Sequence, residues 1–104
     1  MALTFCTNLQ AKTIYHYGKF IKTSVYKNND GSYYYSVICD SQKTTVCAAI
    51  TEPTHDKPGE IEIIDEYQKP VNEVIRFKKL LEPVTAKASL EKVEYLFHID
   101  ELVK

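Results

Sequence analysis

Aromatic and basic side chains alternate in two segments that flank a turn sequence, and such side chains can bind single-stranded nucleic acid. Residues 19–27 read KFIKTSVYK and residues 32–39 read SYYYSVIC, on either side of NNDG at 28–31. Nucleic-acid bases stack on flat rings for about 1–3 kcal/mol each, and lysines neutralise the neighbouring phosphates. The predicted binding residues are Lys19, Phe20, Lys22, Tyr26, Lys27, Tyr33 and Tyr35.

The turn sequence determines which of these side chains would share a face. An Asp-Gly pair between strand-like segments favours a hairpin, because both residues tolerate a positive φ angle. If Asp30 and Gly31 form a two-residue turn, Tyr26 lies opposite Tyr35. Because side chains alternate along a strand, one face would then carry Phe20, Lys22, Tyr26, Tyr33 and Tyr35, and the other would carry the core residues Ile21, Val25 and Ile38. Aromatic pairs also stabilise sheets without binding anything, so a structural role stays open.

A second interpretation is a small protein-binding module, such as a viral inhibitor or an accessory subunit. Tyrosine is common at protein interfaces because it joins a rigid apolar body to a polar tip. Either the tyrosine-rich hairpin or the acidic segment 60–66 (EIEIIDE) would form the contact. A homodimer would fit both interpretations, because an open edge strand invites pairing.

Charge is distributed unevenly along a chain whose formal net charge is −1. Residues 1–50 carry five lysines against two aspartates, whereas residues 51–104 carry eight basic against twelve acidic side chains. This asymmetry favours an anionic partner for the first half, although short segments also vary by chance.

Motifs that would indicate an enzyme are missing from the sequence. The three glycines lie far apart, so there is neither a P-loop nor a dinucleotide-binding fingerprint. His16, His55 and His98 have no metal-ligand spacing with one another or with a cysteine pair. We therefore predict a non-catalytic protein without a metal site or a cofactor.

The cysteines and the chain start predict a cytoplasmic protein. Cys6, Cys39 and Cys47 form an odd set without C-x-x-C spacing, which is typical of reduced thiols. Cys39 and Cys47 flank a turn and could form a cross-strand disulfide, but two small buried side chains are the favoured interpretation. The first residues lack the basic segment and long apolar run of a signal peptide, and no stretch is apolar enough to span a membrane.

Alternation and turn residues predict several short strands. Besides the hairpin, strands are expected at 12–17, 44–50 and 60–67, with a loop at 52–59. Val71, Val74 and Ile75 recur at helical spacing after Pro70, so a short helix is predicted over 71–81, ended by Pro83. Residues 92–100 alternate as a strand, which is favoured over a helix capped at Ser89.

These elements predict a single domain over the 104 residues, of the α+β class but mostly β. Five to six strands and one short helix would form a small antiparallel sheet or an open barrel, with an OB-like barrel and an α+β roll as the alternatives. In strand order and composition the chain loosely resembles small phage-type single-stranded-DNA-binding proteins with OB folds. No motif carries this resemblance, so no residue roles are transferred.

Overall fold

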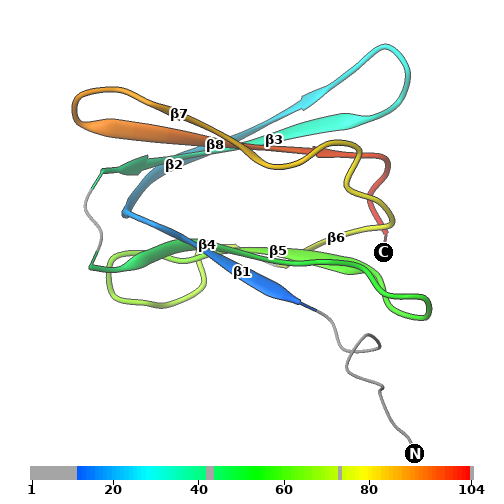
Figure 1. Cartoon of the computed structure of the whole chain (residues 1–104), viewed down its shortest axis with the longest axis horizontal. Helices are drawn as coiled ribbons and strands as arrows, with labels where there is room; N and C mark the ends of the chain where they lie inside the picture. The colour runs from blue at the N-terminus through cyan, green and yellow to red at the C-terminus, as the bar shows by residue number, and fades with distance from the viewer. Residues whose placement is uncertain (1–11, 42–43, 73, 104) are drawn as a thin grey trace, which may run out of the picture.

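A computed structural model describes residues 12–41, 44–72 and 74–103, which form two antiparallel sheets of four strands each (Figure 1). The first sheet has the order β1-β4-β5-β6 and the second has the order β2-β3-β8-β7. The strand bounds are β1 Thr13–Tyr17, β2 Lys19–Lys27, β3 Tyr33–Asp40, β4 Val46–Thr51, β5 Gly59–Ile63, β6 Ile75–Phe77, β7 Thr85–Ala88 and β8 Lys92–Ile99. The mostly-β prediction is confirmed, but the sheets stack face to face and no closed barrel forms.

The core lies between the two sheets because each sheet turns one face inward. Alternate residues of β3 and β8 point into this layer, and Val37, Phe97 and Ile99 are completely buried. Ile61 and Phe77 meet them from the first sheet and are equally buried. The outward side chains of both sheets remain for contacts with solvent or with a partner.

Gly18 carries the chain from the first sheet to the second. Its φ of +142° lies in a region that residues with a side chain rarely adopt, and a Cβ there would lie 2.2 Å from the carbonyl oxygen of Asp40. Its amide donates to the carbonyl of Thr45 (2.9 Å), so the bend is tied to the start of the β4 strand. The predicted early strand is therefore confirmed as β1, which lies in a different sheet from β2 (Figure 1).

The helix predicted over 71–81 is wrong, because this part of the chain pairs with β5 and contains β6. Gly59 lies opposite Phe77, and the absence of a side chain at Gly59 leaves room for the Phe77 ring. In this strand the Phe77 ring is completely buried, and this packing between distant segments overrides a helical spacing that contains few apolar residues. Val71, one of the residues at helical spacing, and Leu81, at the end of the predicted helix, are 38% and 45% exposed.

The strand prediction for the C-terminal segment is confirmed. β8 lies between β3 and β7 in the second sheet, with Val93, Phe97 and Ile99 facing the core. No helix in the described residues is long and apolar enough to span a membrane.

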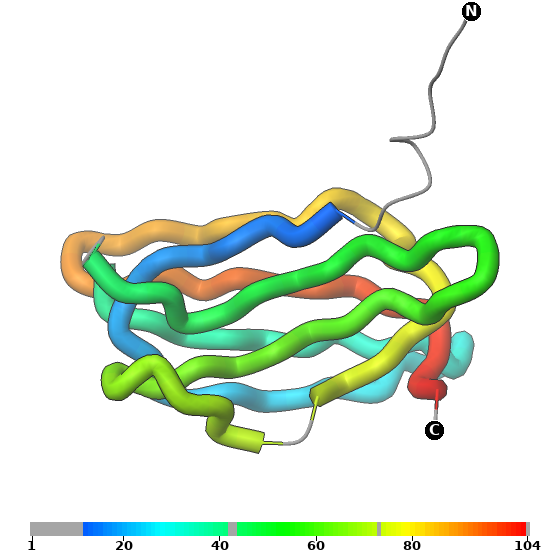
Figure 2. Tube along the Cα trace, turned by 90° about the horizontal axis from the view of Figure 1, so that it is seen from below, coloured from blue at the N-terminus to red at the C-terminus, as the bar shows by residue number. Residues whose placement is uncertain are grey.

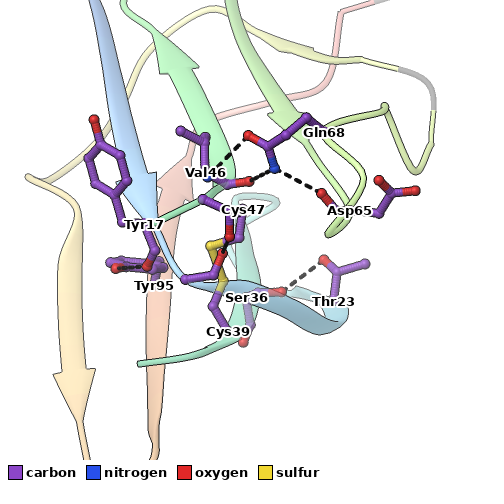
Figure 3. Close-up of a disulfide and its surroundings, with 11 residues drawn as sticks. Tyr17, Thr23, Ser36, Cys39, Val46, Cys47, Asp65, Gln68 and Tyr95 are labelled. Carbon is purple, nitrogen blue, oxygen red and sulfur yellow. Dashed lines mark hydrogen bonds between the residues drawn. A yellow bond between two sulfur atoms is a disulfide. The ribbon is translucent and has the colours of Figure 1, made fainter. Parts of the chain in front are cut away.

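A disulfide between Cys39 of β3 and Cys47 of β4 connects the two sheets (Figure 3). The Cα atoms lie 6.5 Å apart, and both side chains are completely buried. The prediction of reduced thiols is therefore wrong for this pair, because the fold places both side chains at the same point of the core. Cys6 lies outside the described residues.

Candidate binding surfaces

The hairpin turn between β2 and β3 contains three residues instead of the two expected. The amide of Asn28 donates to the carbonyl of Ser32 (2.8 Å), and the amide of Gly31 donates to the carbonyl of Asn28 (3.1 Å). Gly31 has a φ of +92°, as in a type I turn that ends in a glycine bulge. The extra turn residue shifts the strand register by one position, so that Tyr26 lies opposite Tyr34 rather than opposite Tyr35.

The shifted register divides the aromatic residues of the predicted binding face between two sides. Tyr35 lies in the core and is 8% exposed. Phe20 and Tyr33 also pack against the core. Of the predicted stacking rings, Tyr26 alone points away from the core, and it is 56% exposed. A one-residue slip moves every following side chain to the other face, which explains this correction.

The three predicted lysines of β2 have different surroundings. Lys22 lies opposite Ile38 and shares the outward face with Tyr26. Lys27 points the other way, with its Nζ 5.9 Å from the centre of the Tyr33 ring. Lys19 forms an ion pair with Glu66 (3.6 Å), which reduces the charge available to an anionic partner.

An aromatic row that the sequence did not reveal crosses the outward face of the second sheet. Its members are Tyr26 of β2, Tyr34 of β3 and His98 of β8, which lie opposite one another in adjacent strands. The rings of Tyr34 and His98 stack with centres 4.2 Å apart and planes 15° apart. The alternation of residues 92–100 puts His98 on the opposite side of the strand from Phe97, but the neighbour of His98 depends on strand order.

His98 lies between a serine and a carboxylate, in an arrangement that resembles a catalytic triad. Its Nε2 is 3.1 Å from Ser32 Oγ and its Nδ1 is 2.6 Å from Glu82 Oε2. However, Ser32 Oγ donates its hydrogen to Asp30 (2.6 Å), and the residue is only 5% exposed. The serine oxygen is thus held by a second carboxylate and is poorly accessible to a substrate. The arrangement fastens the hairpin tip to β8.

Hydrogen bonding in this cluster shifts two pKa values in opposite directions. Hydrogen bonds from Ser32 lower the pKa of the Asp30 carboxyl, because they stabilise its charged form. The Tyr34 hydroxyl donates to Glu82 (3.1 Å), and this bond raises the Tyr34 pKa. At neutral pH, the hairpin tip therefore presents a carboxylate and a neutral phenol.

The rest of the outward face of the second sheet mixes apolar, hydroxyl and charged side chains. Leu96 is half-buried between Ser36 and Thr85 of the adjacent strands, and Ile38 is half-buried between Lys22 and Glu94. The Ser36 hydroxyl donates to the Glu94 carboxylate between them. Both signs of charge occur on this face, on Lys22, Asp40, Lys87, Lys92 and Glu94. We refer to this surface, including the aromatic row, as the outer face of the second sheet.

The acidic segment 60–66, predicted as a contact surface, is partly neutralised by basic side chains of neighbouring segments. Glu60 pairs with Arg76 (3.3 Å) on the neighbouring strand β6, and Glu66 pairs with Lys19. A shallow groove of about 280 Å³ lies on the outward side of the first sheet, with Thr13, Tyr15, Thr51, Glu60 and Glu62 among its lining residues. Because two carboxylates are in ion pairs, this segment is not a continuous acidic surface.

A second groove, of about 340 Å³, opens between β1 and the strands β7 and β8. Its lining includes Tyr15, Tyr17, Ala88, Val93 and Tyr95. The hydroxyl of Tyr95 donates to the carbonyl of Tyr17 (2.8 Å), which joins the two sheets across the floor (Figure 3). Tyr15 and Tyr17 are 54% and 47% exposed, so the groove has an aromatic rim.

His16 lies inside this second groove with one unsatisfied nitrogen. Its ring packs on Tyr95 (4.6 Å between centres) and meets the edge of Phe97 (5.6 Å). Nε2 is buried and has no hydrogen-bond partner, which is uncommon for a polar atom. Burial lowers the pKa of His16, so the imidazole is neutral at pH 7.

The described residues contain no group of three or more His, Cys, Asp or Glu side chains that could hold a metal ion. Comparison of the chain with protein-family models, with curated proteins and with solved structures gives no match.

Proposed function

We propose that this domain is a non-catalytic protein-binding module that contacts its partner through the outer face of the second sheet. The observation that carries the proposal is that aromatic and aliphatic side chains share this face with charges of both signs. The apolar members are Tyr26, Tyr34, Ile38 and Leu96, and Tyr26 is the most exposed of them.

The aromatic content of this face is typical of a protein interface. Interfaces have a core enriched in aromatic residues and depleted in charge, surrounded by a polar rim. Tyr34 and His98 are already stacked and hydrogen-bonded to Glu82, so little side-chain freedom would be lost when a partner binds. An inhibitor or accessory subunit would use such a preorganised surface.

Single-stranded nucleic acid is a second candidate partner. Its support is the pair Tyr26 and Lys22, which are exposed on the same face of β2. The carboxylates Glu82 and Glu94 lie on this face as well, and they oppose a polyanion. Tyr35 is in the core and could not stack on a base without local unfolding. These placements favour the protein partner.

The hydrogen bonds made by Ser32 favour a non-catalytic role for the domain. In an activated serine the hydroxyl hydrogen points to the histidine, whereas here it points to Asp30.

The Cys39–Cys47 bond contradicts the reduced thiols on which the cytoplasmic prediction partly rested, since such bonds persist mainly in oxidising compartments. We therefore propose that the domain works in an oxidising environment.

Site-specific photocrosslinking tests the proposal in cells of the organism that encodes the chain. A photoreactive phenylalanine analogue replaces Tyr26, and the matched control carries it at Tyr67, which is 76% exposed in the connection between β5 and β6. Protein adducts are expected from position 26 and not from position 67. A Leu96→Arg change that preserves folding should remove them.

The same experiment separates the two candidate partners. Adducts that contain nucleic acid, and that are lost together with salt-sensitive oligonucleotide binding in a Tyr26→Ala variant, would establish the second candidate. Equal adducts from positions 26 and 67 would overturn both candidates, because the outer face would then not be a preferred contact surface for any partner.

A further inference from the structure

β1 is an exposed sheet edge without the charged residues or proline by which many proteins prevent edge pairing, and its ladder with β4 shifts register only at its end, between His16 and Tyr17. Its sequence TIYHY contains no lysine, carboxylate or proline. Ile14, Tyr15 and Tyr17 are 39%, 54% and 47% exposed. Figure 2 shows this strand at one margin of the first sheet, with β7 of the second sheet behind it.

The other three edge strands of the described residues carry such features. β2 contains Lys19, Lys22 and Lys27, and its ladder is interrupted between Phe20 and Lys22. β6 has only three residues, and the carbonyl of Arg76 already accepts a hydrogen bond from the C-terminal segment. β7 has four residues and contains Lys87. Two copies joined along β2 would bring lysines close together, whereas β1 raises no such charge conflict.

The hydrogen bonds to β4 show which backbone groups of β1 face outward. The carbonyl of Lys12 accepts from Glu52 (2.9 Å), and the amide of Gly18 donates to Thr45 (2.9 Å). In an antiparallel pair, alternate residues turn both their amide and their carbonyl to the same neighbour. The residues that turn these groups to the open edge are therefore Thr13, Tyr15 and Tyr17.

We propose that a second copy of this chain binds there, with β1 pairing antiparallel to β1 around a two-fold axis at Tyr15. Tyr15 would then lie opposite Tyr15 of the second copy, and Thr13 would lie opposite Tyr17 of the second copy. This register uses the outward-facing amides of all three residues and the carbonyls of Thr13 and Tyr15. The Tyr17 carbonyl, which already accepts a hydrogen bond from the Tyr95 hydroxyl (2.8 Å), would accept a second one. It joins the two first sheets into one continuous sheet of eight strands.

The side chains also fit this register. The central tyrosines would form an aromatic cross-strand pair, which stabilises antiparallel sheets. On the inward face, Ile14 would lie opposite His16 of the second copy and would lose its exposure to water. Burial keeps His16 neutral, so no like charges meet along the strand. The outer face of the second sheet stays free, so the dimer would present two copies of the proposed partner-binding surface.

Charged substitutions at position 15 test the proposal, because the side chain at this position would lie opposite the same position of the second copy. Tyr15→Glu and Tyr15→Lys each place like charges opposite each other, and each should weaken dimerisation at least about tenfold. An equimolar mixture of the two variants should recover a dimer, since opposite charges then meet. Tyr67→Lys is the control for a new charge on an exposed tyrosine. Sedimentation velocity over a concentration series measures each dissociation constant.

Amide hydrogen exchange gives a second measurement of the same register. Raising the concentration of the wild-type protein should protect the amides of Thr13, Tyr15 and Tyr17, with no change at Ile14 and His16, whose amides face β4. The proposal is overturned if the wild-type protein stays monomeric at millimolar concentration. It is also overturned if both charged variants dimerise normally, or if their mixture recovers nothing. These outcomes leave the proposed function of the second sheet untouched.

Discussion

Breaking the disulfide between Cys39 and Cys47 should lower the free energy of unfolding by about 2.5 kcal/mol. The bond spans a sequence separation of eight residues, so it closes a short loop in the unfolded chain. For a loop of about nine residues, the chain-entropy relation gives a loss of about 8.6 cal/mol/K, which is about 2.6 kcal/mol at 25 °C. In a domain of 104 residues this corresponds to a decrease in Tm of about 10 °C.

Urea unfolding of two preparations of the wild-type chain isolates this effect. One preparation stays oxidised, and the other is unfolded, reduced and refolded with reductant, because both sulfurs are completely buried in the folded state. The midpoint should fall and the m-value should rise on reduction, since the reduced unfolded chain exposes more surface. The double variant Cys39→Ala/Cys47→Ala should lose additional stability, because it also removes buried atoms from the core.

Thiol counting decides whether the reasoning is right. The chain contains three cysteines, so the denatured and unreduced protein should react at one thiol. Three reactive thiols would refute the cross-link. A single reactive thiol with no change in midpoint on reduction would instead refute the entropic argument.

Two further substitutions test how the core and the groove beside β1 are built. Gly59→Ala should destabilise the fold by about 1–3 kcal/mol, because the new Cβ would lie 2.4 Å from the Phe77 ring. The midpoint of urea unfolding measures this effect, and an unchanged midpoint would contradict the close packing of Gly59 and Phe77. Burial lowers the folded-state pKa of His16 below its usual 6.5, so the unfolded chain takes up a proton first and stability should fall as the pH drops through about 6.5. His16→Phe should flatten this part of the stability–pH profile and should raise stability at pH 7, since the buried Nε2 of His16 has no hydrogen-bond partner. An unchanged profile would argue against the burial of His16 as the cause of the pH dependence.

Local patterns predicted the elements whose signals lie within a few residues. The Asp-Gly turn identified the hairpin between β2 and β3, and the alternation over 92–100 identified β8. The prediction of a helix over 71–81 was wrong because the spacing of its apolar residues was a weak local signal. Pairing with β5 and the space above Gly59 decided the conformation of that segment, and both depend on residues distant in sequence.

The candidate site was predicted only in part, because it depends on register. Tyr26 and Lys22 do lie on an outward face, as expected. Tyr35 does not, because one extra turn residue reverses the faces of the opposite strand. His98 and Glu82 could not be assigned to the hairpin from the sequence, since they lie about fifty residues or more beyond Tyr34 and reach it through strand order.

The sequence by itself determined that this chain is a mostly-β domain with a tyrosine-rich hairpin, because alternation and turn chemistry act over short distances. Tertiary structure decided that the strands form two stacked sheets, that Cys39 meets Cys47, and that β1 is an open uncharged edge. The physical reason is that strand neighbours are chosen by hydrogen bonds and burial between distant segments. Local residue patterns do not encode those choices uniquely.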